Sequence, residues 1–152
     1  MVILMRTYYI FNVNKYFSHM YKNKSFKMYK IFEEIYRTKD YDGIKTYSIM
    51  EQVANPFNKI MLNEYINFKY KCKFEYERKD NLHILKGREN TNLIINNYNI
   101  KIRTTNNYSI FFNDLNEYND NLFVCDFENK DYFWLSKLCV SSRGNKVIEV
   151  TR

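Results

Sequence analysis

Residue types that carry out acid–base chemistry are few in this chain. Glu33 and Glu34 form the nearest approach to a carboxylate pair, but adjacent helix residues point about 100° apart and cannot easily share a substrate. The two histidines, His19 and His83, have no obvious nucleophile near them in the sequence. We therefore expect Glu33 and Glu34 to form a solvated helix edge, and His83 to be a hydrogen-bonded core or edge histidine of an apolar strand.

The motifs that hold phosphates, cofactors or metals are also missing. The sequence has no dinucleotide-binding or P-loop glycine pattern, no nucleophile-elbow serine and no zinc-protease helix motif. Residues 141–145 resemble a phosphate loop but contain too little glycine, so we interpret them as part of a tail. We predict that the protein is not an enzyme.

The three cysteines give no sign of a metal site. Cys72, Cys125 and Cys139 are widely spaced, contain no CxxC pair and have no histidine at ligand spacing. We therefore expect no metal and no cofactor. Cys72 and Cys125 lie in apolar, strand-like runs and are expected to be small core residues.

The protein is basic, and the charge is uneven. Lys and Arg number 24 against 17 Asp and Glu, which gives a net charge of +7, and residues 1–76 carry +6 of it. A basic half favours nucleic acid, an anionic membrane or an acidic protein surface. No basic run exceeds two residues, and aromatic residues do not alternate with arginine as in RNA-binding sheets. We expect no specific nucleic-acid binding, and a small basic nucleic-acid-binding regulator is the alternative function.

No segment of the sequence indicates a membrane or secretion. No apolar stretch approaches the roughly 18 residues of a membrane-spanning helix. The apolar residues 1–5 are too short for the core of a signal peptide. We therefore predict a cytoplasmic protein without a membrane partner.

The first half of the chain is expected to form one strand followed by helices. Residues 6–13 are rich in aromatic and β-branched side chains, which favours a strand. Asn14 is a candidate cap of a short helix. Ser25 is a candidate cap of a second helix, whose core-facing stripe is Met28, Ile31, Phe32 and Ile35. Two more helices are expected: one over residues 43–54, with Asp40 or Asp42 as its cap, and one within residues 57–68.

The second half is expected to form mostly strands. Aromatic and charged residues alternate over 70–77, which predicts a half-buried strand. Further strands are predicted, in chain order, at 82–85, 93–95, 100–102, 123–127 and 132–135. One late helix includes Phe111, Phe112 and Leu115, with Asn106 or Asn107 as its cap. The predicted fold is α+β, with a largely antiparallel sheet packed with the N-terminal helices and one late helix. Residues 5–137 form the single domain, and residues 138–152 form a polar C-terminal tail.

Five segments, taken in order, carry a family resemblance: 6–11 (RTYYIF), 17–21 (FSHMY), 55–56 (NP), 110–112 (IFF) and 126–135 (DFENKxYxWL). They resemble the aromatic strand, Phe-x-x-x-Tyr helix, helix-ending proline, late helix and closing hairpin of the sporulation inhibitor of replication family (SirA). These are small cytosolic proteins of spore-forming Firmicutes. The similarity covers about residues 5–137. Ser136 and Lys137 depart from the pattern, because the family tends to have Asn-Pro there.

The resemblance implies a function by protein binding, without chemistry or a cofactor. The family binds domain I of the replication initiator DnaA and stops it from acting at the origin while a cell commits to sporulation. Its Phe-x-x-x-Tyr pair belongs to the partner surface, which implies that role for Phe17 and Tyr21. The short helix before the proline also looks like part of that surface. Ile49 and Gln52 lie there, three residues apart on one helix face.

The residues themselves leave two arrangements open for the first helix. Phe17 and Tyr21 share one face at i, i+4 spacing, and Tyr16 and Met20 form the neighbouring stripe. A short helix cannot bury both stripes in a small domain, so one stripe is exposed or covers a partner. In one arrangement Phe17 and Tyr21 are core and Tyr16 and Met20 lie outside. With the resemblance we expect Phe17 and Tyr21 to be aromatic anchors at an interface, with Met20 beside them.

Overall fold

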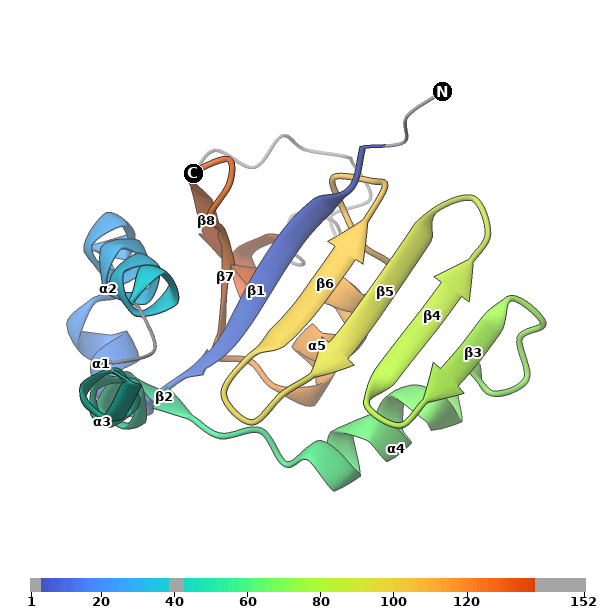
Figure 1. Ribbon diagram of the computed structural model, residues 1–152, viewed down its shortest axis with the longest axis horizontal. Coiled ribbons are helices and arrows are strands. Elements are labelled where there is room, and N and C mark those ends of the chain that lie inside the picture. The colour runs from blue at the N-terminus through green and yellow to red at the C-terminus, as the bar shows by residue number, and fades with distance from the viewer. Residues whose placement is uncertain (1–3, 39–42, 139–152) are drawn as a thin grey trace.

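One antiparallel sheet of eight strands, covered by helices, forms the fold in the computed structural model, which describes residues 4–38 and 43–138 (Figure 1). The strands are β1 Arg6–Val13, β2 Ala54–Asn55, β3 Tyr76–Lys79, β4 Leu82–Lys86, β5 Asn90–Ile95, β6 Ile100–Thr104, β7 Leu122–Asp126 and β8 Asp131–Trp134. The main helices are α1 Lys15–Met20, α2 Ser25–Arg37, α3 Gly43–Val53, α4 Lys59–Tyr70 and α5 Phe111–Tyr118. The predicted α+β class is confirmed.

Strand β1 lies in the interior of the sheet, between β6 and β7. The strand order is β3-β4-β5-β6-β1-β7-β8, and β2 pairs with the end of β1. Within β1, Ile10 lies opposite Ile100 on one side and Val124 on the other. Because β1 has neighbours on both sides and a helix layer on each face, its central part is buried, as its aromatic and β-branched sequence predicted.

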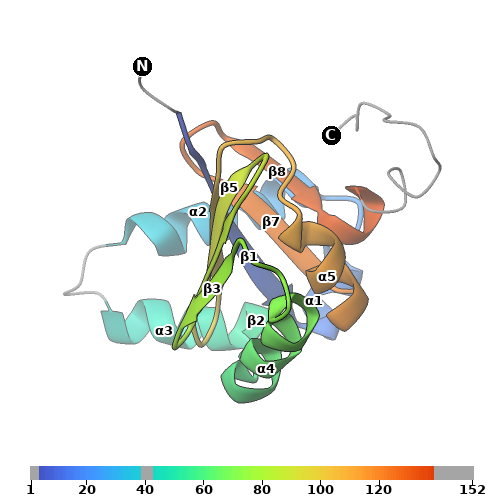
Figure 2. The same ribbon diagram turned by 90° about the vertical axis from the view of Figure 1, so that its right-hand side faces the viewer.

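Two hydrophobic cores lie on opposite faces of the sheet, because successive strand residues point to opposite sides. Tyr8 and Ile10 face one core, which is completed by α4 and α5. Phe11 and Val13 face the other, which is completed by α2 and α3. Figure 2 shows α2 and α3 on one side of the sheet and α4 and α5 on the other. The helices of the candidate site therefore belong to the second core.

The strand predicted over residues 70–77 is wrong. Tyr70 is the last residue of α4, where it packs edge-to-face on Phe111 at 5.3 Å between ring centroids. Its burial continues the helical stripe of Ile66, and the chain then turns, so β3 begins only at Tyr76. Cys72 in this turn is exposed and is not the core residue predicted, whereas Cys125 is buried as expected.

Two of the predicted helix caps are also wrong. Lys24 occupies the cap position of α2, and Ser25 is the first helical residue. At α5 the cap position is Ile110, whose N–H donates to Glu89 Oε1 at 3.0 Å, and Ser109 Oγ accepts from Phe111 N at 3.2 Å. Asn14, by contrast, caps α1 as predicted.

The predicted boundaries at the third helix and the C-terminus can be followed only in part. Residue 54 belongs to β2 rather than to the helix predicted over 43–54, and Asp40 and Asp42 lie outside the described residues. So do Cys139 and the loop-like segment 141–145. Leu138, the last described residue, is buried in the core beside α5.

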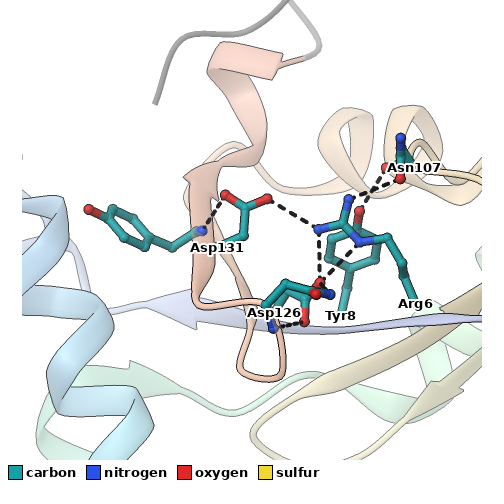
Figure 3. A network of polar contacts seen from close by, with 7 residues as sticks. Arg6, Tyr8, Asn107, Asp126 and Asp131 are labelled. Atoms are coloured by element: carbon teal, nitrogen blue, oxygen red, sulfur yellow. Dashed lines mark hydrogen bonds and ion pairs between the residues drawn. The ribbon is translucent and has the colours of Figure 1, made fainter.

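The closing hairpin of β7 and β8 is held by a polar network around Arg6 (Figure 3). The Arg6 guanidinium donates to Asp126 Oδ2 at 2.8 and 3.0 Å and to Asp131 Oδ2 at 3.2 Å. It also donates to Asn107 Oδ1 at 3.1 Å. Asp126 is buried and also accepts from Asn129. These polar contacts therefore fix the closing hairpin to the start of β1.

Candidate partner-binding site

Four of the five predicted partner-binding residues line one groove between α1, α2 and α3, which we call the aromatic groove. Phe17 lies in α1, Tyr21 is the residue directly after it, and Ile49 and Gln52 come from α3. The groove has a volume of about 390 Å³. Its other lining residues are Ile31, Glu34, Ile35, Thr38, Thr46 and Val53. The structure thus brings together two segments that lie about thirty residues apart in the chain and that the resemblance had connected.

Hydrogen bonds at its start and in its middle position α1, because a helix of six residues would be unstable in isolation. At its start, Asn14 Oδ1 accepts from Tyr16 N at 2.9 Å, and Asn14 N donates to the Val53 carbonyl at 2.9 Å. Further along, Ser18 Oγ donates to Asn121 Oδ1 at 2.9 Å. Asn121 in turn donates to the Val13 carbonyl at 2.8 Å. These contacts fix α1 against the ends of α3 and β7.

Phe17 and Tyr21 are neither core nor fully exposed. Their rings stack at 4.5 Å between centroids with 25° between the planes. Both side chains are half-buried and pack against the core of α2 and α3. Each ring therefore has one side in contact with the protein and contributes the other to the groove. Phe17 and Tyr21 are thus partly covered by the core, and their role at an interface stays a prediction.

Met20 lies on the other side of α1, apart from the four residues above. It is 58% exposed, and Tyr16 is 82% exposed. Both line a wider groove of about 1190 Å³ together with Asn121, Trp134 and Lys137. The buried indole N–H of Trp134 has no acceptor among the described residues. Tyr16 and Met20 are thus the outward stripe of the helix.

Sequence reasoning missed the contribution of α2 to the aromatic groove. It placed Ile31 and Ile35 in the core-facing stripe, but both are half-buried and line the groove. The fully buried residues of the helix are Met28, Tyr29 and Phe32. Spacing offers a signal for this: Ile31 and Ile35 are an i, i+4 pair at the edge of the apolar stripe, where a helix side chain is only partly covered.

The carboxylates next to the groove are arranged for structure rather than for acid–base chemistry. Glu33 is not solvated as predicted, because it accepts from the Tyr29 hydroxyl at 2.9 Å and from Lys30 Nζ at 3.0 Å. Those hydrogen bonds from Lys30 and Tyr29 lower the pKa of Glu33. Glu34 is exposed and lines the groove, as an isolated carboxylate.

The one buried histidine lies on the far side of the sheet, between β4 and α4. His83 Nε2 is 2.7 Å from Asn63 Oδ1, and Nδ1 is 2.6 Å from the Tyr76 hydroxyl. Burial lowers its pKa to about 4. His83 is therefore the hydrogen-bonded core histidine that was predicted.

The groove offers an apolar surface for binding. Six of its ten lining residues are aliphatic or aromatic, and the polar atoms come from Glu34, Thr38, Thr46 and Gln52. Within the described part of the chain, no cluster of three or more His, Cys, Asp or Glu residues could hold a metal ion. Burial raises the pKa of the Cys125 thiol. Such a lining is typical of a pocket that takes an apolar side chain of a partner.

Comparison with known families shows to which family the chain belongs. A family model described as sporulation inhibitor of replication protein SirA matches residues 6–138. The chain belongs to the SirA family. The match covers the strands and helices given above, including the three helices of the aromatic groove. The resemblance predicted from five short segments is thereby confirmed. The family also supports a regulatory role as an inhibitor of replication in sporulation. No curated protein matches the chain.

Across residues 4–38 and 43–138, every helix is too short or too polar to cross a membrane.

Proposed function

We propose that this SirA family protein inhibits the initiation of DNA replication by binding domain I of the initiator DnaA through the aromatic groove. Membership in the SirA family supports the role of a replication inhibitor. The observation that carries the proposal is the convergence of Phe17, Tyr21, Ile49 and Gln52 on one groove. The family resemblance, rather than residue spacing, is the ground on which these residues are expected at the partner surface.

The form of the groove supports this mode of binding. Phe17 and Tyr21 are held at a fixed position by their own stacking and by the core beneath them, so little side-chain entropy is lost when a partner binds. Aromatic residues of this kind are common binding hot spots. Gln52 is exposed at the groove and has both a donor and an acceptor to offer at its rim. An apolar side chain of DnaA domain I would enter between α1 and α3.

Binding of DnaA domain I by three single variants tests the proposal. Phe17→Ala, Tyr21→Ala and Ile49→Ala should each weaken binding by about 10- to 100-fold, because each removes a wall of the groove. Isothermal titration calorimetry measures the affinity, and the melting temperature reports the fold. Ile49 is the most informative position, because it is 37% exposed and its truncation should leave the fold intact.

Ile60→Ala is the matched control for Ile49→Ala. Ile60 is the same residue type, is 79% exposed and lies on α4, which packs on the opposite face of the sheet. It should bind as tightly as the wild type. A folded Ile49→Ala or Phe17→Ala variant with wild-type affinity would contradict the proposal, as would the absence of any binding by the wild type.

A further inference from the structure

A run of lysines without an acidic neighbour in the sequence extends over α1 and the first turn of α2, and Asp120 is an acidic residue that the fold brings to the same wider groove. From residue 7 to residue 32 the chain contains five lysines and no Asp or Glu. One of them, Lys30, pairs with Glu33. The other four are exposed and make no ion pair with a described residue, and we call them the lysine rim: Lys15, Lys22, Lys24 and Lys27.

The lysine rim is continuous with exposed apolar side chains. Tyr16 and Met20 lie on α1 between Lys15 and Lys22, and all four line the wider groove. Phe26, on the first turn of α2 beside Lys24 and Lys27, is 57% exposed. The turn that joins the two helices starts at Tyr21, which belongs to the aromatic groove. The charged rim and the aromatic groove thus flank the same short helix.

The composition of this surface favours a protein over a nucleic acid. Between residues 7 and 36 there is no arginine, the residue best suited to bind phosphates and base edges with two parallel hydrogen bonds. Helix α1 has six residues, too few for a recognition helix that lies along a groove of DNA. Exposed Tyr, Met and Phe side chains, in contrast, are enriched in protein interfaces.

The charge also argues against a second copy of this chain as the occupant. A two-fold symmetric contact would bring the same patch together with itself. Lysines of one copy would then face lysines of the other, and like charges brought together in an interface are costly. An acidic surface is the complement of the lysine rim.

We propose that the lysine rim recognises an acidic surface on the protein partner, so that carboxylates of the partner face Lys15, Lys22, Lys24 and Lys27 while its apolar side chain enters the aromatic groove. This inference rests on the proposed function and adds the charge of the partner's contact face. Attraction between opposite charges speeds the encounter of two proteins, and salt screens it. The lysine rim therefore acts mainly on the association rate, whereas the aromatic groove acts mainly on the dissociation rate.

The test measures association and dissociation rates for DnaA domain I by stopped flow at about 50 and 300 mM salt. Lys22→Glu/Lys24→Glu should slow association about tenfold or more at the lower salt, flatten the salt dependence and leave the dissociation rate within about twofold. The matched control is Lys86→Glu/Arg88→Glu, which changes the net charge equally. Lys86 ends β4, three strands from β1 in the sheet, so this variant should associate close to the wild-type rate.

Each outcome bears on one of the two proposals. If the wild type binds and Lys22→Glu/Lys24→Glu associates as fast as the wild type, the lysine rim is not a steering surface and this inference is wrong, while the groove proposal stands. If the control slows as much as the rim variant, only net charge matters, and the inference is wrong as well. If the wild type does not bind DnaA domain I, both proposals fail. Binding of a 30-bp duplex DNA at physiological salt, lost in the rim variant, would assign the rim to nucleic acid instead.

Discussion

Protonation of His83 should destabilise the fold strongly, because its ring is fully buried between β4 and α4. Asn63 Nδ2 donates to Asn81 Oδ1 at 2.9 Å, which leaves Asn63 Oδ1 as the acceptor for Nε2–H. Nδ1 then accepts from the Tyr76 hydroxyl. The neutral ring is therefore satisfied at both nitrogens, and a positive charge would have to be buried.

The size of the effect follows from the two pKa values. Burial, followed by the charge of Arg78, lowers the pKa of His83 to about 4, against an ordinary value of about 6.5 in the unfolded chain. Between these values the unfolded chain binds the proton and the folded chain does not, so stability is complete above pH 6.5 and is lost as the pH falls toward 4. At pH 5 the loss is about 2 kcal/mol.

Urea unfolding at pH 7.5 and pH 5, followed by circular dichroism, measures this loss. Several carboxylates also titrate in this range, so the useful quantity is the difference between wild type and His83→Gln, which retains a donor and an acceptor but does not titrate. This difference should fall by about 2 kcal/mol between the two pH values.

A direct titration of the imidazole gives a second test that needs no variant. The NMR resonances of His83 should show almost no protonation down to about pH 5. A His83 that titrates near pH 6.5 would refute the reasoning, because the burial and the paired hydrogen bonds would then not restrain its charge.

Three further variants test the structure at other points. Phe112→Ala, at a fully buried ring of α5, should lower the free energy of unfolding by about 3–5 kcal/mol in urea titrations, and no measurable loss would mean that the ring is not core. Asp126→Ala removes the main partner of Arg6 and should cost about 3 kcal/mol in the same assay, with Lys79→Ala, at an exposed residue, as the near-neutral control. Asn121→Ala removes the contacts to Ser18 and Val13 that hold α1. Binding of DnaA domain I should therefore weaken several-fold, although this residue lies outside the aromatic groove. Unchanged affinity would mean that α1 is positioned without Asn121.

Elements with one strong periodic pattern were predictable from the sequence. Residues of the central strand β1 face the two cores on opposite sides of the sheet, and the strand covers its predicted range of residues 6–13. Helix α2 was predicted from an apolar stripe, and the closing hairpin from two apolar runs on either side of a polar turn. In each case the local pattern and the tertiary packing favour the same structure, so a prediction from the sequence is reliable.

The errors fall where two patterns overlap. Over residues 70–77 the alternation of aromatic and charged residues fits a strand, yet Tyr70 also continues the helical spacing of Ile66. Packing on Phe111 decides in favour of the helix, and nothing local records that long-range contact. Glu33 is a similar case, because its pairing with Tyr29 and Lys30 depends on which face of α2 is buried.

The candidate site shows why residue patterns alone left Phe17 and Tyr21 undecided. Their i, i+4 spacing fits a core stripe and an interface stripe equally well, and in the structure each ring is half-buried, with one side on the core and the other in the aromatic groove. A half-buried ring cannot be assigned to a core or to an interface by hydrophobicity, since both environments favour the same side chain. What distinguishes the two environments is the position of Ile49 and Gln52 across the groove, and that depends on how α3 packs against α1. The family resemblance linked these segments in advance because its pattern extends over both helices, whereas periodicity reports on one helix at a time.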